Sequence, residues 1–238
     1  MKIALIGYGK MGKAIEEIAI KKGHEIVLKI DVNNLTDFTK EKLSNADVAI
    51  EFTSPHTAFE NVKKCMDYSV PVICGSTGWL DKWNEIETFC IEKDGTFLYA
   101  SNFSIGVNLF FELNTYLAKL MNTYANYNVT ITEIHHTQKK DAPSGTAITL
   151  AEQILANNPS KEKWINQPTG NNNELEIISE RIDPAPGTHT IKYSSIIDDI
   201  EITHTAHNRV GFASGAILAA EFVVGKKGIF NMKDALGL

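Results

Sequence analysis

The sequence feature that most constrains the fold is a glycine-rich turn close to the N-terminus. The run Gly7-Tyr8-Gly9-Lys10-Met11-Gly12 matches the pattern G-x-G-x-x-G. Residues 2–6 are apolar as in a short buried strand, and residues 13–22 have the apolar spacing of a helix. A glycine turn between strand and helix lets the backbone approach a pyrophosphate, which the N–H groups of the helix start face. The sequence therefore predicts a dinucleotide-binding unit; the alternative is a glycine-rich turn that binds no nucleotide.

The residue after the second expected strand bears on the choice of dinucleotide. Asp31 follows residues 25–30 at close to the roughly 20-residue spacing from the last glycine that is typical of a ribose-binding acid. A carboxylate there accepts hydrogen bonds from a ribose 2′-hydroxyl and repels a 2′-phosphate. Val32 offers no compensating cation, although Lys10 could soften the repulsion. We expect NADH to be preferred, with NADPH as the alternative.

Strands and helices alternate throughout the first part of the chain. After the second strand, the expected strands are residues 47–53, 70–74 and 96–100, with helices at 58–68 and 81–92. This alternation predicts an α/β fold with a Rossmann-type doubly wound parallel sheet. Gly75, Ser76 and Thr77 form a small loop after the fourth strand, which is either suited to a nicotinamide or its ribose or a plain connection.

The character of the chain changes after residue 104. A long amphipathic helix is expected at residues 107–121, and strands then outnumber helices, which predicts a second, α+β domain with a mixed sheet. The expected strands are residues 128–134, 176–182, 188–193 and 199–205, and residues 161–174 read as a polar loop or flap. We assign residues 1–104, completed by 215–238, to the dinucleotide domain and residues 105–214 to a substrate and oligomerisation domain. Hinges are expected near residues 104–106 and 213–215.

A cluster of cations follows the first strand of this second domain. Residues 133–147, EIHHTQKKDAPSGTA, carry two imidazoles and two ammonium groups, although the formal net charge of the chain is −6. A positive cluster on an acidic protein indicates a site for a small anion rather than for nucleic acid. The histidines close a strand, and α/β sheets present ligands at the carboxyl ends of their strands.

The groups in this stretch predict a chemistry. His135 could donate or accept a proton near neutral pH, and Lys139 could donate one or hold a carboxylate. The N–H groups that open the next helix, near Gly145 and Thr146, could bind a carboxylate because the first turn of a helix has no intrahelical acceptors for them. The alternative is a solvated basic loop in which Ser144 only caps the helix.

Other features narrow the class of protein. The three cysteines form no CxxC pair, and no apolar run is long enough to cross a bilayer, so we expect a cytoplasmic protein with free thiols and no membrane partner. His189, His204 and His207 lack the spacing of metal ligands, so we expect packed histidines and no metal. Arg181, His189 and Arg209 are weaker candidates for anion contacts.

The run at residues 133–147 resembles the signature of the 4-hydroxy-tetrahydrodipicolinate reductase (dihydrodipicolinate reductase) family. The likeness spans nearly the whole chain, through residues 7–12, 52–53, 75–78, 100–106, 201–204 and 228–234. The resemblance implies that NADH or NADPH reduces a cyclic dicarboxylate imine precursor to tetrahydrodipicolinate in lysine and diaminopimelate biosynthesis. It also implies a homotetramer joined through the second domain.

The resemblance further implies roles for single residues. His135 is similar to the family's proton donor and acceptor, and Lys139 to its second proton donor. His136, Gly145 and Thr146 are similar to its substrate-carboxylate contacts. The implied cofactor contacts are Gly7, Tyr8, Gly9, Lys10, Met11, Gly12, Asp31, Gly75, Ser76, Thr77, Ala100, Ser101, Asn102 and Phe103. Two features depart from the family pattern: Val32 replaces an arginine that many relatives carry, and residues 183–187 are rich in proline.

Two rival functions share the glycine turn. One is another NAD-dependent oxidoreductase, such as an amino-acid or aspartate dehydrogenase, and the other is a non-enzymatic dinucleotide sensor. The doubled histidine with Lys139 argues against the first. A sensor has no need of proton donors beside a carboxylate-binding helix start.

Overall fold

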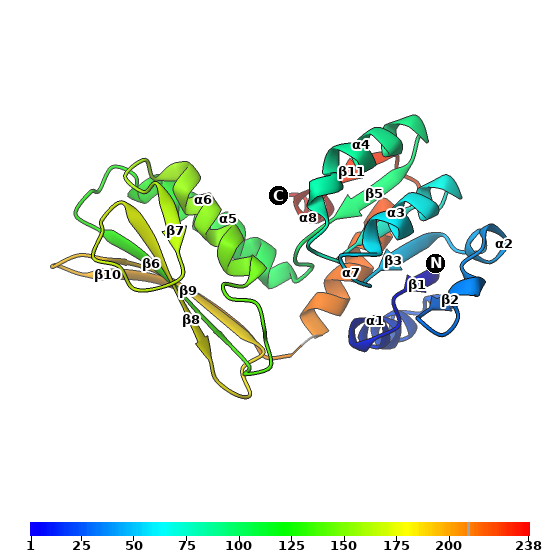
Figure 1. The fold of residues 1–238 in the computed structure, drawn as a ribbon, viewed down its shortest axis with the longest axis horizontal. Coiled ribbons are helices and arrows are strands. Elements are labelled where there is room, and N and C mark those ends of the chain that lie inside the picture. Colours follow the sequence, from blue (N-terminus) through cyan, green and yellow to red (C-terminus); the bar gives the residue numbers. More distant parts are fainter. Residues whose placement is uncertain (209) are drawn as a thin grey trace. The chain divides into compact units, whose positions relative to one another are not determined.

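The computed structural model describes residues 1–208 and 210–238, and the chain divides into two compact units (Figure 1). The first combines Met1–Ile105 with Arg209–Leu238, and the second is Gly106–Asn208. The return to the first unit comes earlier than the expected residue 215, because helix α7 (Val210–Val223) begins before it. The hinge expected at residues 213–215 lies inside α7. A Cβ on Gly215 would come 1.7 Å from the carbonyl oxygen of Phe103, so the small residue there allows close packing.

The sheet of the first unit is parallel throughout and has the order β11-β5-β4-β3-β1-β2. Its strands are β1 (Lys2–Ile6), β2 (Glu25–Ile30), β3 (Val48–Glu51), β4 (Val72–Cys74), β5 (Thr96–Tyr99) and β11 (Gly228–Phe230). The expected doubly wound sheet is thereby confirmed. The strand order reverses between β1 and β3, and such a switch point is where these sheets bind ligands.

Helices cover both faces of this sheet (Figure 1). One face carries α1 (Lys10–Lys21), α7 and α8 (Met232–Leu236), and the other carries α3 (Ala58–Asp67) and α4 (Trp83–Glu92). Short helical turns connect these elements at η1 (Leu35–Asp37), α2 (Lys40–Leu43) and η2 (Leu80–Lys82). Side chains of β1 alternate between the two cores, as the pleat of a strand requires.

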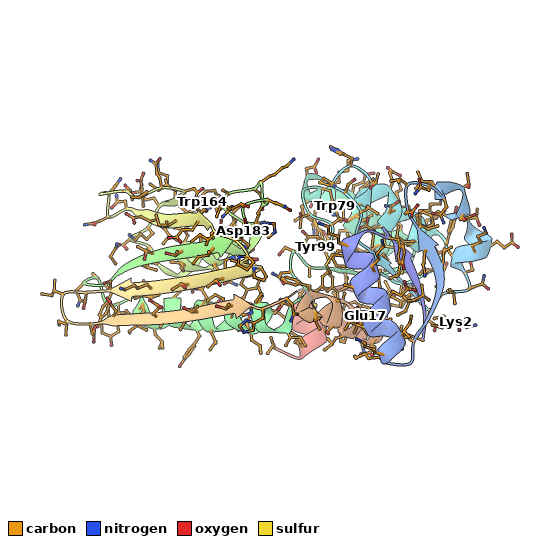
Figure 2. The ribbon with its side chains drawn as sticks, turned by 90° about the horizontal axis from the view of Figure 1, so that it is seen from below. Lys2, Glu17, Trp79, Tyr99, Trp164 and Asp183 are labelled. Atoms are coloured by element: carbon orange, nitrogen blue, oxygen red, sulfur yellow. The ribbon has the colours of Figure 1, made fainter. Side chains whose placement is uncertain are left out.

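Aromatic rings reinforce the core under α3 and α4. Trp79 and Tyr99 meet edge to face with ring centroids 6.0 Å apart (Figure 2). The Trp79 indole also donates a hydrogen bond to the carbonyl oxygen of Ser76 at 2.7 Å. The loop after β4 is therefore fixed by the core beneath it.

The second unit packs two helices on a mixed sheet of order β10-β9-β6-β8-β7 (Figure 1). Its elements are α5 (Ile105–Met121), β6 (Asn128–His135), α6 (Gly145–Asn157), β7 (Lys163–Ile165), β8 (Glu174–Arg181), β9 (Gly187–Ser194) and β10 (Asp199–Ala206). Strand β6 is parallel to β8 and antiparallel to β9, so the predicted mixed sheet is confirmed.

The prediction of a loop or flap at residues 161–174 is wrong in part, because β7 lies within it and pairs with β8. An edge strand has one hydrogen-bonded neighbour, so a run of only 3 residues within this segment can form it. Among the described residues, no helix is both long and apolar enough to cross a membrane.

Candidate active site

Strand register brings polar side chains together in the second unit. In β6, Glu133 pairs with His189 of β9 on one side and with Ser179 of β8 on the other. His135, two residues further along, pairs with Arg181 of β8. Residues two apart on a strand share a face, so Glu133 and His135 continue the buried face of β6 that α5 and α6 cover. The cluster therefore forms at the carboxyl end of β6.

The carboxylate of Glu133 is the centre of this cluster and is fully buried, at 0% exposure. Its Oε1 accepts hydrogen bonds from Oγ of Ser179 at 2.7 Å and from Nη2 of Arg181 at 3.2 Å. Both carboxylate oxygens accept the backbone N–H of Ser144 at 3.1 Å. The start of helix α6 is therefore tied to the sheet through one side chain.

The second oxygen of Glu133 faces two imidazoles. Oε2 lies 3.5 Å from Nδ1 of His135 and 3.7 Å from Nε2 of His189. Burial alone would raise the pKa of Glu133, but the polar contacts with His189, Ser144 and Ser179 outweigh it and hold the pKa well below its usual range. Glu133 is therefore a buried, ionised group at neutral pH, and a guanidinium balances its charge.

His135 is nearly buried and stays neutral at pH 7. Its ring meets that of His189 edge to face, with centroids 5.0 Å apart. Burial lowers the pKa of His135 to about 4, with help from His189, Lys139 and Arg181 and against the pull of Glu133. An anion bound beside the ring would raise this pKa, because it favours the charged form.

The turn after β6 holds Lys139 by its backbone. Arg181 donates from Nη2 to the carbonyl oxygen of Asp141 at 2.6 Å and from Nε to that of Lys139 at 3.4 Å. The N–H and hydroxyl of Thr137 donate to Asp183, at 3.1 and 2.6 Å. The ammonium of Lys139 pairs with the carboxylate of Asp141 at 2.7 Å. A second anion could replace that exposed carboxylate without moving the turn.

Helix α6 begins at an open backbone surface. Ser144 is its N-cap, since its hydroxyl accepts the N–H of Ala147 at 3.2 Å, and the same hydroxyl contacts Nε2 of His189 at 3.1 Å. Gly145 is exposed, and a Cβ there would meet no atom within 4 Å. Ser144 thus caps the helix as the alternative reading expected, and the capped end also presents open space at the positive pole of the helix dipole.

The donor atoms of Glu133, His135 and His189 lie within 4.8 Å of one another, close enough to share a metal ion. The guanidinium of Arg181 nonetheless occupies Oε1, and the N–H of Ser144 contacts both oxygens. The guanidinium already neutralises this carboxylate, and its charge would repel a metal ion placed beside it. We therefore interpret the cluster as a proton-handling network.

The structure gathers the predicted substrate residues around this network. His135 is buried, His136, Lys139 and Thr146 are partly buried, and Gly145 is exposed. Of the weaker anion candidates, Arg181 and His189 are used inside the network, and Arg209 lies outside the described residues.

The three glycines of the turn in the first unit differ in the space around them. Gly7 has φ +98°, and a Cβ on it would come 2.0 Å from the carbonyl oxygen of Phe52. A Cβ on Gly12 would come 2.4 Å from the carbonyl oxygen of Gly7, whereas a Cβ on Gly9 would meet no atom within 4 Å. The outer glycines therefore permit packing, and the middle one leaves the start of α1 open, which fits a dinucleotide pyrophosphate.

Asp31 directly follows strand β2 and is partly buried. Its Oδ1 accepts the backbone N–H of Asn33 at 2.7 Å, and no cation among the described residues forms an ion pair with it. Val32 is 86% exposed, so nothing at that position offsets the negative charge. Lys10 is exposed at the first position of α1.

The loops after β4 and β5 are tied to the loop after β3. The N–H of Thr53 donates to Oγ of Ser76 at 2.8 Å, and a Cβ on Gly75 would come 2.1 Å from the ring of Phe52. Phe103 packs on the same ring, with centroids 5.6 Å apart. Ser76 and Phe103 thus use their side chains within the unit and can offer a ligand mainly backbone. The other predicted cofactor residues are exposed (Thr77, Ser101), partly buried (Tyr8, Met11, Ala100) or buried (Asn102).

Two buried carboxylates have roles in the structure that were not predicted from the sequence. One is Glu133, and the other is Glu51, which ends β3. Glu51 accepts hydrogen bonds from the N–H of Thr53 at 3.1 Å, from Sγ of Cys74 at 3.0 Å and from Nδ2 of Asn61 at 3.3 Å. Their sequence positions could have indicated such roles, because an acidic residue at an inward-facing position of an apolar strand is rarely buried without a partner.

Comparison with known proteins decides the family. Residues 1–103 match the family model described as the N-terminus of dihydrodipicolinate reductase, and residues 106–236 match the one described as its C-terminus. The chain belongs to the dihydrodipicolinate reductase family. Two members named 4-hydroxy-tetrahydrodipicolinate reductase are similar to it. The protein of Christiangramia forsetii is 50% identical over 99% of this chain and 98% of its own length. That of Methanoregula boonei is 37% identical over 91% and 83%.

Solved structures agree on the fold of this reductase family. A dipicolinate-bound dihydrodipicolinate reductase from Paenisporosarcina sp. TG-14 matches with a TM-score of 0.78 at 24% identity, over 98% of each chain. An amine dehydrogenase from Mycobacterium smegmatis matches with a TM-score of 0.61 at 11% identity, over 99% of this chain and 95% of its own. Reductases and dehydrogenases thus share this architecture, and the family assignment comes from the sequence matches.

Proposed function

We propose that this chain, an oxidoreductase of the dihydrodipicolinate reductase family, reduces 4-hydroxy-tetrahydrodipicolinate to tetrahydrodipicolinate in lysine and diaminopimelate biosynthesis. The supporting observation in the structure is the arrangement in the second unit. An imidazole and an ammonium group, those of His135 and Lys139, follow one strand, and the open start of helix α6 follows the same turn. This arrangement suits an anionic substrate that must receive a proton.

The residues of the first unit fit a nicotinamide dinucleotide. The open position at Gly9 and the tightly packed Gly7 and Gly12 form a backbone cradle at the start of α1. When bound, the reduced nicotinamide supplies the hydride of the reaction. Gly75 and Phe103 pack against Phe52, so the loops at residues 75–77 and 100–103 that contain them are candidates to position the nicotinamide end.

A substrate with two carboxylates needs two anchors. We assign one to the backbone at Gly145 and Thr146, where the dipole of α6 favours a negative charge. We assign the other to His136 and Lys139, whose ammonium already holds the carboxylate of Asp141 in the ligand-free protein. Exchange of one carboxylate for another keeps the charge balance of the turn.

His135 and Lys139 are the proton donors in this proposal. Hydride addition to a conjugated imine leaves an electron-rich enamine, which must take a proton. Before substrate binds, Lys139 is an ammonium group paired with Asp141, and His135 is neutral because burial lowers its pKa to about 4. A bound dianion raises the pKa of His135 and thereby charges the ring only when substrate is present.

One assay tests this function. The full chain is mixed with NADH and the freshly prepared cyclic imine substrate, and the loss of NADH absorbance is followed. In the control assays the substrate is replaced by oxaloacetate with ammonium, again with NADH, or by aspartate with NAD+, where turnover would raise the NADH absorbance. We expect oxidation with the cyclic imine only. Turnover with aspartate or oxaloacetate instead would assign the chain to the rival dehydrogenases, and no turnover with any of them would leave the dinucleotide sensor.

We infer that NADH is preferred to NADPH. Asp31 carries an unbalanced carboxylate at the end of β2, and Val32 supplies no cation, so a 2′-phosphate meets repulsion. The ratio of kcat/KM for the two cofactors measures the preference, and Asp31→Ser should reduce it. A clear preference of the unchanged protein for NADPH would contradict the inference.

We infer a homotetramer assembled through the second unit, and a cytoplasmic location. Four apolar side chains at helical spacing on α5 are exposed: Leu109 at 45%, Leu113 at 57%, Tyr116 at 64% and Leu120 at 49%. A partner copy would bury such a stripe. The three free, buried cysteines suit a reducing compartment. Light scattering gives the mass of the assembly, and Leu113→Glu should lower it.

A further inference from the structure

His135 meets different neighbours at its two ring nitrogens. Nδ1 is buried, has no hydrogen-bond partner among the described residues, and lies 3.5 Å from Oε2 of Glu133. Nε2 lies on the side of Gly187, where a Cβ would come 3.1 Å from that nitrogen. One nitrogen therefore faces a fixed negative charge, and the other faces a residue that has no side chain.

The oxygens of Glu133 are divided between two tasks. Oε1 is held by the hydroxyl of Ser179 and the guanidinium of Arg181, at 2.7 and 3.2 Å. Oε2 is left to the N–H of Ser144 and to the two imidazoles. Because side chains of the neighbouring strand β8 hold Oε1 in place, the carboxylate is oriented and Oε2 stays beside Nδ1 of His135.

A neutral imidazole carries its hydrogen on one nitrogen only. If Nδ1 carried the lone pair, that lone pair would face a carboxylate oxygen, which is repulsive. If Nδ1 carries the hydrogen, it points at the carboxylate, and Nε2 keeps the lone pair. Partner groups select the tautomer of a histidine in this way.

We propose that Glu133 and Gly187 are positioning residues that make Nε2 of His135 the nitrogen that exchanges the proton of the reaction. Glu133 keeps hydrogen on Nδ1, and Gly187 leaves Nε2 uncovered. The link to catalysis rests on the proposed function. The tautomer of His135 depends only on its protein neighbours.

The charges around the ring set the pH dependence that follows. His135 faces Glu133 on its own strand β6, Arg181 on β8, His189 on β9 and Lys139 in the following turn. Glu133 is the negative member of this set and opposes the others. Replacing it with Gln leaves the cations unopposed, so His135 becomes harder to protonate and the basic limb of activity, where the proton donor loses its proton, moves to lower pH.

The test reads the tautomer directly. The full chain is labelled with 15N-histidine, and long-range 1H–15N correlation spectra distinguish Nδ1–H from Nε2–H; comparison with His135→Asn assigns the signals among the 7 histidines. We expect Nδ1–H in the unchanged protein. In Glu133→Gln the side-chain amide can donate to Nδ1, so we expect Nε2–H there. Ser179→Ala is the matched control, because it removes one hydrogen bond to Oε1 but keeps the charge, and it should retain Nδ1–H.

Gly187→Ala tests the other half and does not depend on the folding of Glu133→Gln. The added methyl covers Nε2, so kcat should fall by roughly 10-fold or more while the affinities for NADH and dipicolinate change little. Nε2–H in the unchanged protein, or full kcat in a folded Gly187→Ala, would overturn the proposal. An unchanged protein with Nδ1–H that does not oxidise NADH with the cyclic imine would reject the proposed function and leave the tautomer assignment standing.

Discussion

Each unit of the molecule buries one glutamate near the carboxyl end of a strand, and the two glutamates have different partners. Glu51 in the first unit and Glu133 in the second are both 0% exposed. The described donors to Glu51 are neutral: the N–H and hydroxyl of Thr53, the amide of Asn61 and the thiol of Cys74. Glu133 instead has the guanidinium of Arg181 and two imidazoles nearby.

The difference teaches what a buried carboxylate can do. Neutral donors around Glu51 order the loop that follows β3. The neighbours of Glu133 are titratable, so in our proposal this carboxylate selects the nitrogen of His135 that carries the hydrogen. In the proposed function, the first unit therefore supplies a site made of backbone, with glycines where side chains would intrude, and the second supplies a site made of side chains.

Lys139→Ala should produce the largest effect and tests whether the second unit carries the chemistry. Removal of an acid-base group lowers kcat by roughly 10²-fold or more. NADH oxidation with the cyclic imine measures the change. The matched control is Lys140→Ala, which removes the neighbouring exposed ammonium and should leave kcat within about twofold. Equal losses in both variants would mean that overall positive charge matters and that Lys139 has no special role.

His135→Ala should distinguish the roles of the two units in catalysis and in cofactor binding. We expect a fall in kcat of about 100-fold, because an acid-base group is lost from the second unit. The affinity for NADH should change little, because we propose that the first unit binds it. Calorimetric titration with NADH measures the second quantity. A loss confined to NADH binding would show that His135 has been assigned the wrong role.

Two glycine variants test the backbone site of the first unit. Gly9→Ala adds a methyl in open space, so thermal unfolding should be unchanged while the affinity for NADH falls roughly 10-fold, or ~1.4 kcal/mol. Gly7→Ala adds one 2.0 Å from a carbonyl oxygen at φ +98°, so it should lower the stability by about 1–3 kcal/mol. Gly9→Ala with normal NADH affinity would indicate that the ligand does not approach the start of α1.

The smallest expected effect concerns stability against acid. The pKa of His135 is about 4 in the folded protein and 6.5 as its ordinary value, so the unfolded chain binds the proton more tightly. The contribution of this group to stability is therefore complete above pH 6.5 and declines as the pH falls toward 4. Between pH 7 and pH 5.5 the unchanged protein should lose about 1 kcal/mol more than His135→Asn, as measured by urea unfolding. Parallel curves for the two proteins would contradict the buried, neutral imidazole.

The sequence by itself determined the features that depend on neighbours along the chain. The glycine turn between β1 and α1, the place of Asp31 after β2 and the strand that ends at His135 follow from local periodicity and spacing, and the structure contains each of them. The signature at residues 133–147 indicated the family, which the sequence comparisons confirmed.

Tertiary structure alone decided which partners those residues meet. Glu133 meets Ser179 and His189 because β6 pairs in a particular register with β8 and β9, and Gly187 reaches His135 from 52 positions further along the chain. Likewise β7 formed in a polar segment because an adjacent strand offered hydrogen bonds, and Gly215 packed inside a helix where a hinge was expected. Such contacts depend on long-range pairing and packing, which local residue patterns do not encode, because a shift of one residue in register would turn every side chain to the other face.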